Sequence, residues 1–297
     1  MKLKALILRN VKLFFKDKGM FFTSMVTPMI LLVLYVTFLG KTYTDSFRSA
    51  VPEGLSITDG LIEATVGGEL ISSILAVCCV TVAFCSNMLM VQDKVTGARY
   101  DLLIAPVKRS VMAMSYYIAT VFSTLLVCIA ALGAGLLYVR SVGWYMSAAD
   151  IGWILLDILL VVLFGTALSS IINLFLSTQG QISAVGTIVS AGYGFICGAY
   201  MPISNFGEGL QKVLSFLPGT YGTSLLRNHA MRGVFEQMRA DGFPAEVVEG
   251  IKKSVDCKLY FSGHEVTIPA MYIFLTVTVF VLIAAYVVIH VKKRSGQ

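Results

Sequence analysis

The sequence has few of the residues on which most protein chemistry depends. Only 13% of its 297 residues are charged, and it contains three histidines, six cysteines and two tryptophans. No two of the histidines, His229, His264 and His290, stand within four positions of each other, so no metal-binding pair on one helix is available. Residues 158–207 contain no charged side chain at all. The sequence therefore argues against a metal centre and against an enzyme with clustered acids and bases.

The cysteines and the glycine-rich segments exclude two further classes of site. Five cysteines lie in apolar runs and only Cys257 lies outside them, so no external disulfide can form within the chain and we expect packing roles. Residues 40–42 (Gly-Lys-Thr) resemble the end of a phosphate-binding loop, but the leading glycine is replaced by Tyr35. We expect no cofactor to bind this chain.

Apolar character is what the sequence has in abundance, because 57% of its residues are hydrophobic. Six charge-poor runs are long enough to cross a hydrocarbon core of roughly 30 Å as helices of about 20 residues. Their apolar character is continuous and does not alternate, which favours helices over barrel strands. The sequence predicts an all-α membrane protein with six transmembrane helices, at residues 19–40, 70–91, 111–139, 151–176, 182–203 and 268–291.

The distribution of basic residues predicts the orientation in the cell membrane. Residues 1–18, 92–110 and 292–297 together contain thirteen Lys and Arg against three acids, whereas the opposite side has ten basic and thirteen acidic residues. Because basic residues near span ends stay in the cytoplasm, we expect both termini to be cytoplasmic. Residues 41–69 and 204–267 are then external.

Three segments outside the runs have recognisable patterns. Residues 1–18 place apolar and basic side chains on different faces, which predicts an interfacial amphipathic helix, although an ordinary basic flank is the alternative. In residues 41–69, proline and several glycines predict turns between short helices. In residues 204–267, apolar spacing predicts one helix that ends at Pro218 and another that begins near Pro244, together a small external helical cap.

Small residues recur at every fourth position of the fifth run. On a helix this spacing makes a smooth ridge against which another backbone can pack closely in lipid. The sequence leaves open whether the ridge packs within one chain or between two copies. The ridge consists of Gly186, Ser190, Gly194 and Gly198.

Ion-coupled transport normally requires ionisable groups at membrane depth. Within the apolar runs only Asp157 qualifies, and it lies within two turns of the outer end of its run. We expect this carboxylate to be solvated at the interface, with a proton relay as the less favoured alternative.

Two stretches carry a resemblance to a known family. Residues 92–110 contain Asp93, Gly97, a Leu pair and a Pro-Val before basic residues, and this order resembles the first cytoplasmic loop of type-2 ABC transporter permeases. Residues 198–227, from Gly-Ala-Tyr-Met-Pro-Ile to Leu-Leu-Arg, are similar to the segment after the fifth span of that family. The family usually has two acids before the loop glycine, whereas Val95 stands at the second place here, which weakens the expectation of a salt bridge.

The resemblance implies a permease domain at residues 19–297 and a coupling helix in residues 92–110. That helix would sit in a groove of a separate ABC ATP-binding subunit, present in two copies and holding ATP and Mg²⁺, while a second permease copy, identical or related, completes the pathway. A membrane-surface loop is the alternative for this segment. The implied coupling residues are Asp93, Gly97, Arg99, Leu102, Leu103, Ile104, Pro106 and Arg109.

The resemblance further implies an exporter that works by alternating access and is not itself an enzyme. A pathway almost free of charge suits an amphipathic substrate such as a drug-like natural product, peptide or lipid, and nothing suggests a nucleic-acid partner. Alternatives are a permease for a lipid-linked polysaccharide, an ATP-independent channel or carrier, and a membrane enzyme. The candidate path residues are Phe22, Ser24, Met25, Thr27, Met29, Asn87, Met88, Thr187, Tyr193 and Phe195.

Overall fold

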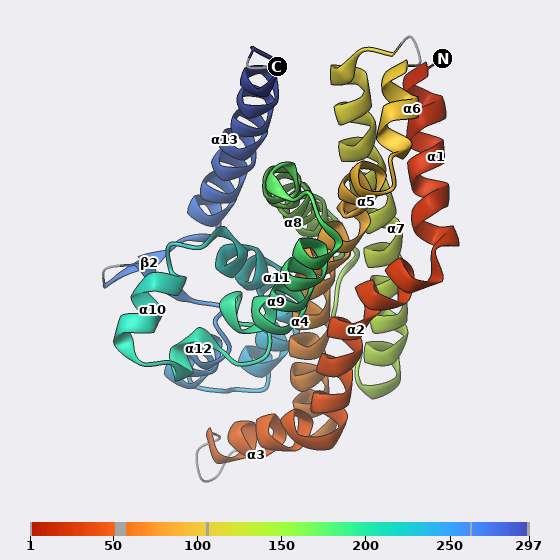
Figure 1. The fold of residues 1–297 in the computed structure, drawn as a ribbon. Helices are drawn as coiled ribbons and strands as arrows, with labels where there is room; N and C mark the ends of the chain where they lie inside the picture. The colour runs from red at the N-terminus through yellow and green to blue at the C-terminus, as the bar shows by residue number, and fades with distance from the viewer. Residues whose placement is uncertain (1, 51–57, 105–106, 262, 296–297) are drawn as a thin grey trace.

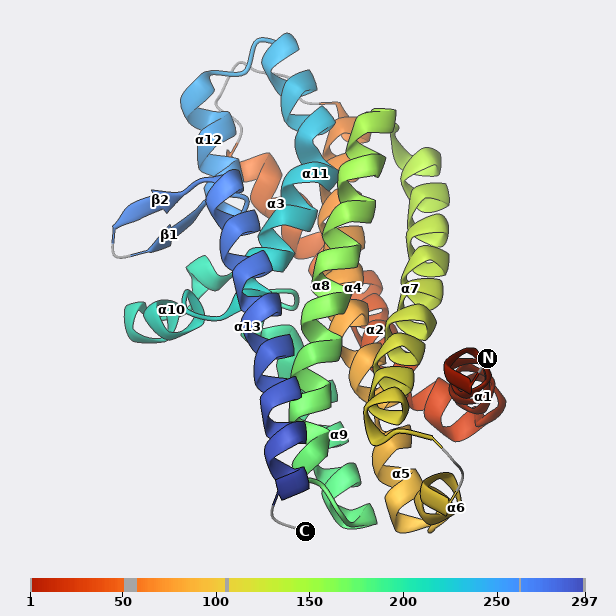
Figure 2. The same ribbon diagram turned by 90° about the horizontal axis from the view of Figure 1, so that it is seen from above.

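A long central helix organises the molecule. Helix α4 (Asp59–Asn87) is almost wholly buried, and α2 (Lys18–Leu34), α7 (Arg109–Val142), α8 (Ala148–Phe175) and α11 (Pro218–Ala240) pack around it (Figures 1 and 2). A helix that is apolar on all sides needs such a position. This computed structural model describes residues 2–50, 58–104, 107–261 and 263–295.

The amino-terminal part forms two helices that meet at Asp17. Helix α1 (Lys2–Lys16) is confirmed as a helix, and its apolar face packs on α7 with Phe14 fully buried. The Asp17 carboxylate then accepts a hydrogen bond from the Met20 amide at 3.1 Å and begins α2. A location of α1 at the membrane surface stays a prediction.

The first and second spans are longer than the apolar runs predicted. Helix α2 continues through a π-helical turn, η1 (Tyr35–Leu39), into α3 (Gly40–Ala50). Helix α4 begins at Asp59, so the prediction of turns through residue 69 is wrong. Its glycine pair forms close helix contacts: a Cβ on Gly68 would lie 3.0 Å from Met231. Glycine here serves helix packing and not turn formation.

Three predicted spans are confirmed as helices. They are α7, α8 and α13 (Ile268–Ser295), of which α8 begins at a capping box in which the Ser147 and Asp150 side chains bind each other's backbone amides. At the carboxyl end of α4, α5 (Leu89–Val95) and α6 (Ala98–Ile104) form a short helical elbow.

The fifth predicted span is shorter and more polar than expected. Helix α9 (Gln179–Ile196) ends seven residues before residue 203, and the chain turns at Gly198 with a φ of +76°. Five helical segments in the described part of the chain are long and apolar enough to span a membrane, and α9 is not among them. The prediction of a helix to residue 203 is therefore wrong.

The segment after α9 is more than an external cap. A 3₁₀ turn, η2 (Ile203–Asn205), leads to α10 (Glu208–Leu214), which is confirmed as a helix but ends four residues before Pro218. Pro218 begins a new helix and does not end the previous one, because proline fits the first turn of a helix. The next element, α11, was not predicted, and it packs inside the bundle against α4, α8 and α13. Residues 204–267 therefore do not form a cap alone.

The chain continues through α12 (Ala245–Ser254) and an antiparallel hairpin of β1 (Leu259–Phe261) and β2 (His264–Val266), in which Leu259 pairs with Val266. All six cysteines are buried, Cys257 included, as expected for packing residues.

Candidate functional site

The elbow formed by α5 and α6 presents an apolar tip at one end of the bundle. Gly97 permits the sharp turn between the two helices, with a φ of +82° and open space where a Cβ would lie. Beyond the turn, Tyr100 is 70% exposed and Ile104 is 84% exposed. Large apolar side chains this exposed, next to the half-buried Arg99 and the exposed Arg109, are typical of a protein contact surface.

Only part of the predicted coupling set projects outward. Leu102 is half-buried and packs on the core of the bundle. Pro106 and the side chain of Leu103 lie outside the described residues. The outward-facing apolar groups of the elbow are therefore Tyr100, Ile104 and Val95.

A salt bridge fixes the base of the elbow to the amino-terminal helix. The Arg9 guanidinium binds both carboxylate oxygens of Asp93, at 2.7 and 3.0 Å, and the Tyr116 hydroxyl donates to the same carboxylate. The hydrogen bond to Asp93 raises the pKa of Arg9. The side chains of Asn10 and Ser115 add a hydrogen bond of 3.3 Å between α1 and α7. We call the set Arg9, Asp93 and Tyr116 the brace.

The brace corrects the expectation drawn from Val95. The missing second acid does not remove a salt bridge, because Arg9 on α1 supplies the partner from 84 residues away in sequence. In the sequence, Arg9 is only one of several basic residues of a predicted amphipathic helix, and nothing there indicates its pairing with Asp93. A bidentate pair of this kind fixes orientation as well as distance, so α1 and the elbow are connected rigidly.

A groove of about 600 Å³ opens on the side of the bundle between α2, the junction of α4 with α5, and α9. Its walls are largely apolar, with several small hydroxyl groups and one carboxylate, Asp17, at the end near α1. The lining residues are Asp17, Gly19, Met20, Thr23, Val26, Ile30, Cys85, Met88, Gln92, Ile182, Ser183, Gly186, Thr187, Ser190 and Ala191.

Of the ten predicted path residues, Met88 and Thr187 line this groove. Four others are buried, namely Ser24, Thr27, Asn87 and Tyr193, and Met25 packs partly buried on the core. Asn87, for example, donates hydrogen bonds to Ser169 and Ser170 on α8. Phe22, Met29 and Phe195 are at least half exposed on the outer surface of the chain.

The four small residues of the fifth run make different contacts, all within this chain. Gly186 faces the Met88 methyl group, and the Ser190 carbonyl accepts a hydrogen bond of 3.1 Å from Thr27 on α2. Gly194 lies against the Tyr200 ring, and Gly198 stands beyond the helix end. They therefore do not form one continuous ridge, because the helix ends before the fourth member.

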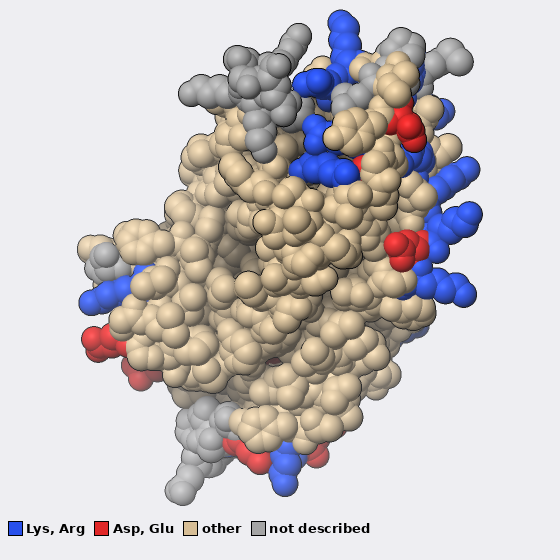
Figure 3. Space-filling model, viewed as in Figure 1, with Lys and Arg blue, Asp and Glu red and all other residues tan. Residues whose placement is uncertain are grey.

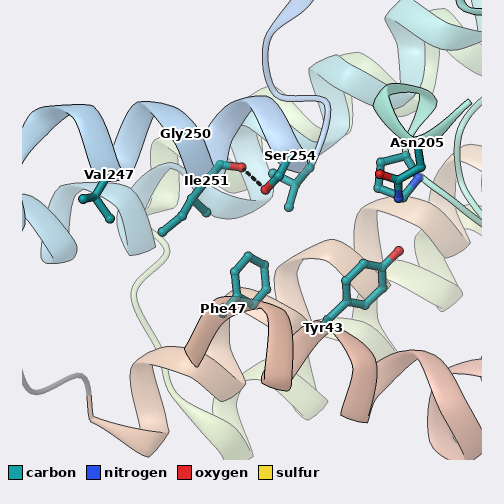
Figure 4. A pocket seen from close by; sticks show the side chains of 9 residues that line it. Tyr43, Phe47, Asn205, Val247, Gly250, Ile251 and Ser254 are labelled. Atoms are coloured by element: carbon teal, nitrogen blue, oxygen red, sulfur yellow. Dashed lines mark hydrogen bonds between the residues drawn. The ribbon is translucent and has the colours of Figure 1, made fainter. Parts of the chain in front are cut away.

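A second cavity, of about 330 Å³, lies between α3 and α12 at the opposite end of the molecule. Figure 4 shows Tyr43 and Phe47 of α3 facing Val247 and Ile251 of α12. None of its nine lining residues is charged, and the Ser254 hydroxyl donates a hydrogen bond to the Ile251 carbonyl. Tyr43 and Asn205 are the other polar side chains of this lining.

Comparison with known families identifies the chain. The model of the ABC-2 type transporter family matches residues 1–230, which include the brace, the elbow and every residue of the groove. The chain belongs to the ABC-2 type transporter family. No curated protein and no solved structure matches it significantly. Such a permease is a multi-pass membrane component that associates with an ABC ATP-binding subunit and is generally not catalytic itself.

Helix α11 is held in the permease by buried charges that sequence analysis did not connect. Arg227 is fully buried between Glu69 of α4, at 3.5 Å, and Asp256 after α12, at 3.4 Å. It also donates to the Gly198 carbonyl at 2.7 Å and to the Ser73 hydroxyl at 3.1 Å. Burial raises the pKa of Asp256, although Arg227 and two backbone amides act in the opposite direction.

A second buried pair corrects the expectation for Asp157. This residue is fully buried, with an oxygen 2.7 Å from Nδ1 of His229, and it accepts a hydrogen bond from the Tyr272 hydroxyl. The prediction of a solvated interface carboxylate is wrong because α11, placed outside by sequence analysis, brings His229 against α8. The Trp153 ring stacks on His229 at 5.6 Å.

Reversing one charge of the brace should loosen α1 from the elbow. We expect Arg9→Asp to lower the stability by about 3–5 kcal/mol, since it leaves two carboxylates facing each other at a partly buried site. The double variant Arg9→Asp/Asp93→Arg should regain part of the loss, whereas Lys12→Asp, on an exposed position of α1, should have little effect. Thermal unfolding in detergent measures all three, and equal melting temperatures for Arg9→Asp and Lys12→Asp would contradict the brace.

Removing the buried cation of α11 should be more damaging than removing an exposed one. Arg227→Met leaves Glu69 and Asp256 buried without the cation that neutralises them, and we expect a loss of about 3–5 kcal/mol or failure to assemble in the membrane. Arg239→Met, on the same helix and half exposed beside Glu249, should cost less than about 1 kcal/mol. Protease resistance of the two variants in membranes compares them, and equal resistance would refute a structural role for the cluster.

Proposed function

We propose that this protein is the permease subunit of an ATP-driven exporter for an amphipathic substrate. The braced apolar tip of the elbow carries the proposal: Tyr100 and Ile104 are solvent-exposed in the isolated chain, and the brace connects them rigidly to α1 and α7. A partner that binds a surface of this kind can transmit its own conformational change to the helical bundle.

In this proposal both termini and the elbow face the cytoplasm. Most of the blue Lys and Arg residues in Figure 3 gather over the end that holds α1 and α6, and a belt of uncharged surface follows below them. Basic residues at one end favour retention of that end in the cytoplasm. Two ATP-binding subunits would contact the two elbows of a permease pair and would hold the ATP and Mg²⁺, while this chain would bind neither.

The groove between α2 and α9 is the proposed substrate path. It begins near Asp17 and Gln92, at the end with the elbow, and reaches Ile30 and Ala191 deeper in the bundle. Its apolar walls and sparse hydroxyls suit an amphipathic molecule that enters from the side. The exposed face of α9, with Ile188 69% exposed, would be covered by the second permease copy.

Charge on the elbow tip should abolish association with the ATP-binding subunit. We expect Tyr100→Asp/Ile104→Asp to reduce copurification of the partner at least tenfold, because a desolvated apolar contact of about 2 kcal/mol or more is lost at each position. The permease itself should melt normally, since both side chains are exposed. Trp144→Asp, a change at an exposed aromatic residue of the opposite end, is the control. A double variant that retained the full complement of partner would count against the coupling role.

A bulky residue inside the groove should block transport while leaving the complex intact. Thr187→Trp fills part of the groove, so we expect substrate efflux from loaded vesicles to fall at least tenfold with the partner still bound. Ile273→Trp, at an exposed position of α13 outside the groove, tests the effect of size alone. Equal efflux rates for Thr187→Trp and the unchanged protein would remove the groove from the path.

A further inference from the structure

A third pocket, of about 490 Å³, lies beside α10 on the side of the molecule away from the groove. It is bounded by α10, the start of α11, the end of α12 and the β-hairpin, and its rim is rich in lysine. Its lining residues are Ile203, Ser204, Glu208, Gln211, Lys212, Ser215, Thr220, Lys253, Asp256, Lys258, Leu259, Tyr260 and Gly263.

Two of the lysines in this pocket have no acidic partner among the described residues. Lys258 is neutralised by Glu249 at 2.7 Å and Glu265 at 3.1 Å. Lys212 and Lys253 form no such pair, and Lys253 lies over the Tyr260 ring at 5.4 Å.

The acids of the pocket do not cancel these two cations. The Asp256 carboxylate is already bound by Arg227 and by the amides of Ile203 and Ser204, which leaves only Glu208 to oppose them. The pocket therefore has an unbalanced positive charge.

The position of α10 places this charge at the membrane boundary. The Tyr221 hydroxyl donates to the Ser215 carbonyl just after α10, and the Tyr221 ring contacts Phe274 of α13 at 4.9 Å between ring centres. Phe274 is the seventh residue of the span that begins at Ile268, about 9 Å along it at 1.5 Å per residue. Figure 2 shows α10 at the level of the first half of α13. The helix therefore lies just inside one end of a span.

The outer face of α10 is apolar at the same depth. Leu210 is 46% exposed, Val213 58% and Phe216 63%, and Phe216 packs edge-on against Phe261 of the hairpin. Exposed apolar residues beside lysines and a tyrosine are typical of a segment that lies in the headgroup region of a bilayer.

We propose that this pocket binds the phosphate headgroup of an anionic phospholipid, with its acyl chain along the exposed face of α10. Lys212 and Lys253 contact the phosphate, and Phe216 and Val213 contact the chain. The site is independent of the proposed substrate groove. With the termini cytoplasmic, the lipid belongs to the outer leaflet.

Lipid retention by the purified full-length chain tests the site. The chain is titrated with phosphatidylglycerol or phosphatidylcholine in detergent, and bound lipid is counted by native mass spectrometry. We expect Lys212→Gln/Lys253→Gln to weaken the binding of one phosphatidylglycerol about thirtyfold, as for two membrane-surface lysines. Phosphatidylcholine binding should not change.

Three further variants keep this test decisive. The control variant Lys41→Gln/Lys252→Gln also removes two lysines, namely Lys41, which is exposed on α3, and Lys252, which is paired with Glu249. This control should retain the lipid. Lys212→Arg/Lys253→Arg should also retain it, and Glu208→Gln should bind it more tightly. If the double Gln variant binds phosphatidylglycerol as the control does, the proposal fails. It fails equally if inorganic phosphate alone displaces the lipid at low millimolar concentration, since the site would then recognise phosphate without a chain.

Discussion

The contact on which the rest of this permease depends is the buried ion cluster around Arg227. One guanidinium joins α4, the turn after α9, α11 and the segment after α12, through Glu69, Gly198 and Asp256. Removing a charge from water is costly, and the cost is recovered only where the geometry and hydrogen bonds are complete. Once formed, such a cluster specifies one arrangement of helices that are otherwise uniformly apolar. It therefore fixes the half of the bundle away from the elbow, and the groove and the lysine-rich pocket beside α10 both take their walls from helices that it positions.

The half of the bundle that holds the elbow has a similar device, built on the partly buried pair of Arg9 and Asp93. The brace connects an amphipathic helix, a span and the elbow, so that movement of the exposed tip must move α1 and α7 with it. Between the two ionic clusters, α4 runs nearly buried from one end to the other. In the proposed function this arrangement would separate two tasks: the ends would recognise partners through charge and exposed aromatic residues, and the middle would transmit force through close packing, which is only slightly compressible.

Sequence patterns predicted most of the helices and the family, but little of the site. Continuous apolar runs predicted five of the long apolar helices, because length and hydrophobicity are the main signals of a membrane span. Two glycines led to wrong predictions. Gly68 was expected in a turn but allows close helix packing, and Gly198 was expected within a helix but lies just after its end. Helix α11 was missed because its polar residues look external until Arg227 and His229 meet acids on other elements. Interacting residues that are far apart in the sequence leave no local pattern. Neither the brace nor the ion cluster around Arg227 could therefore be predicted.

The modest apolarity of α9 has a consequence for biogenesis. With Gln179 and Gln181 in its first turn and four glycines along it, this helix would partition poorly into lipid by itself. It follows α8 after a three-residue turn that Thr178 and Gln181 close as a capping box, but it packs on α2, α4 and α5. Insertion of α9 then relies on apolar helices that were made before it, and the order of synthesis becomes part of how the groove is built.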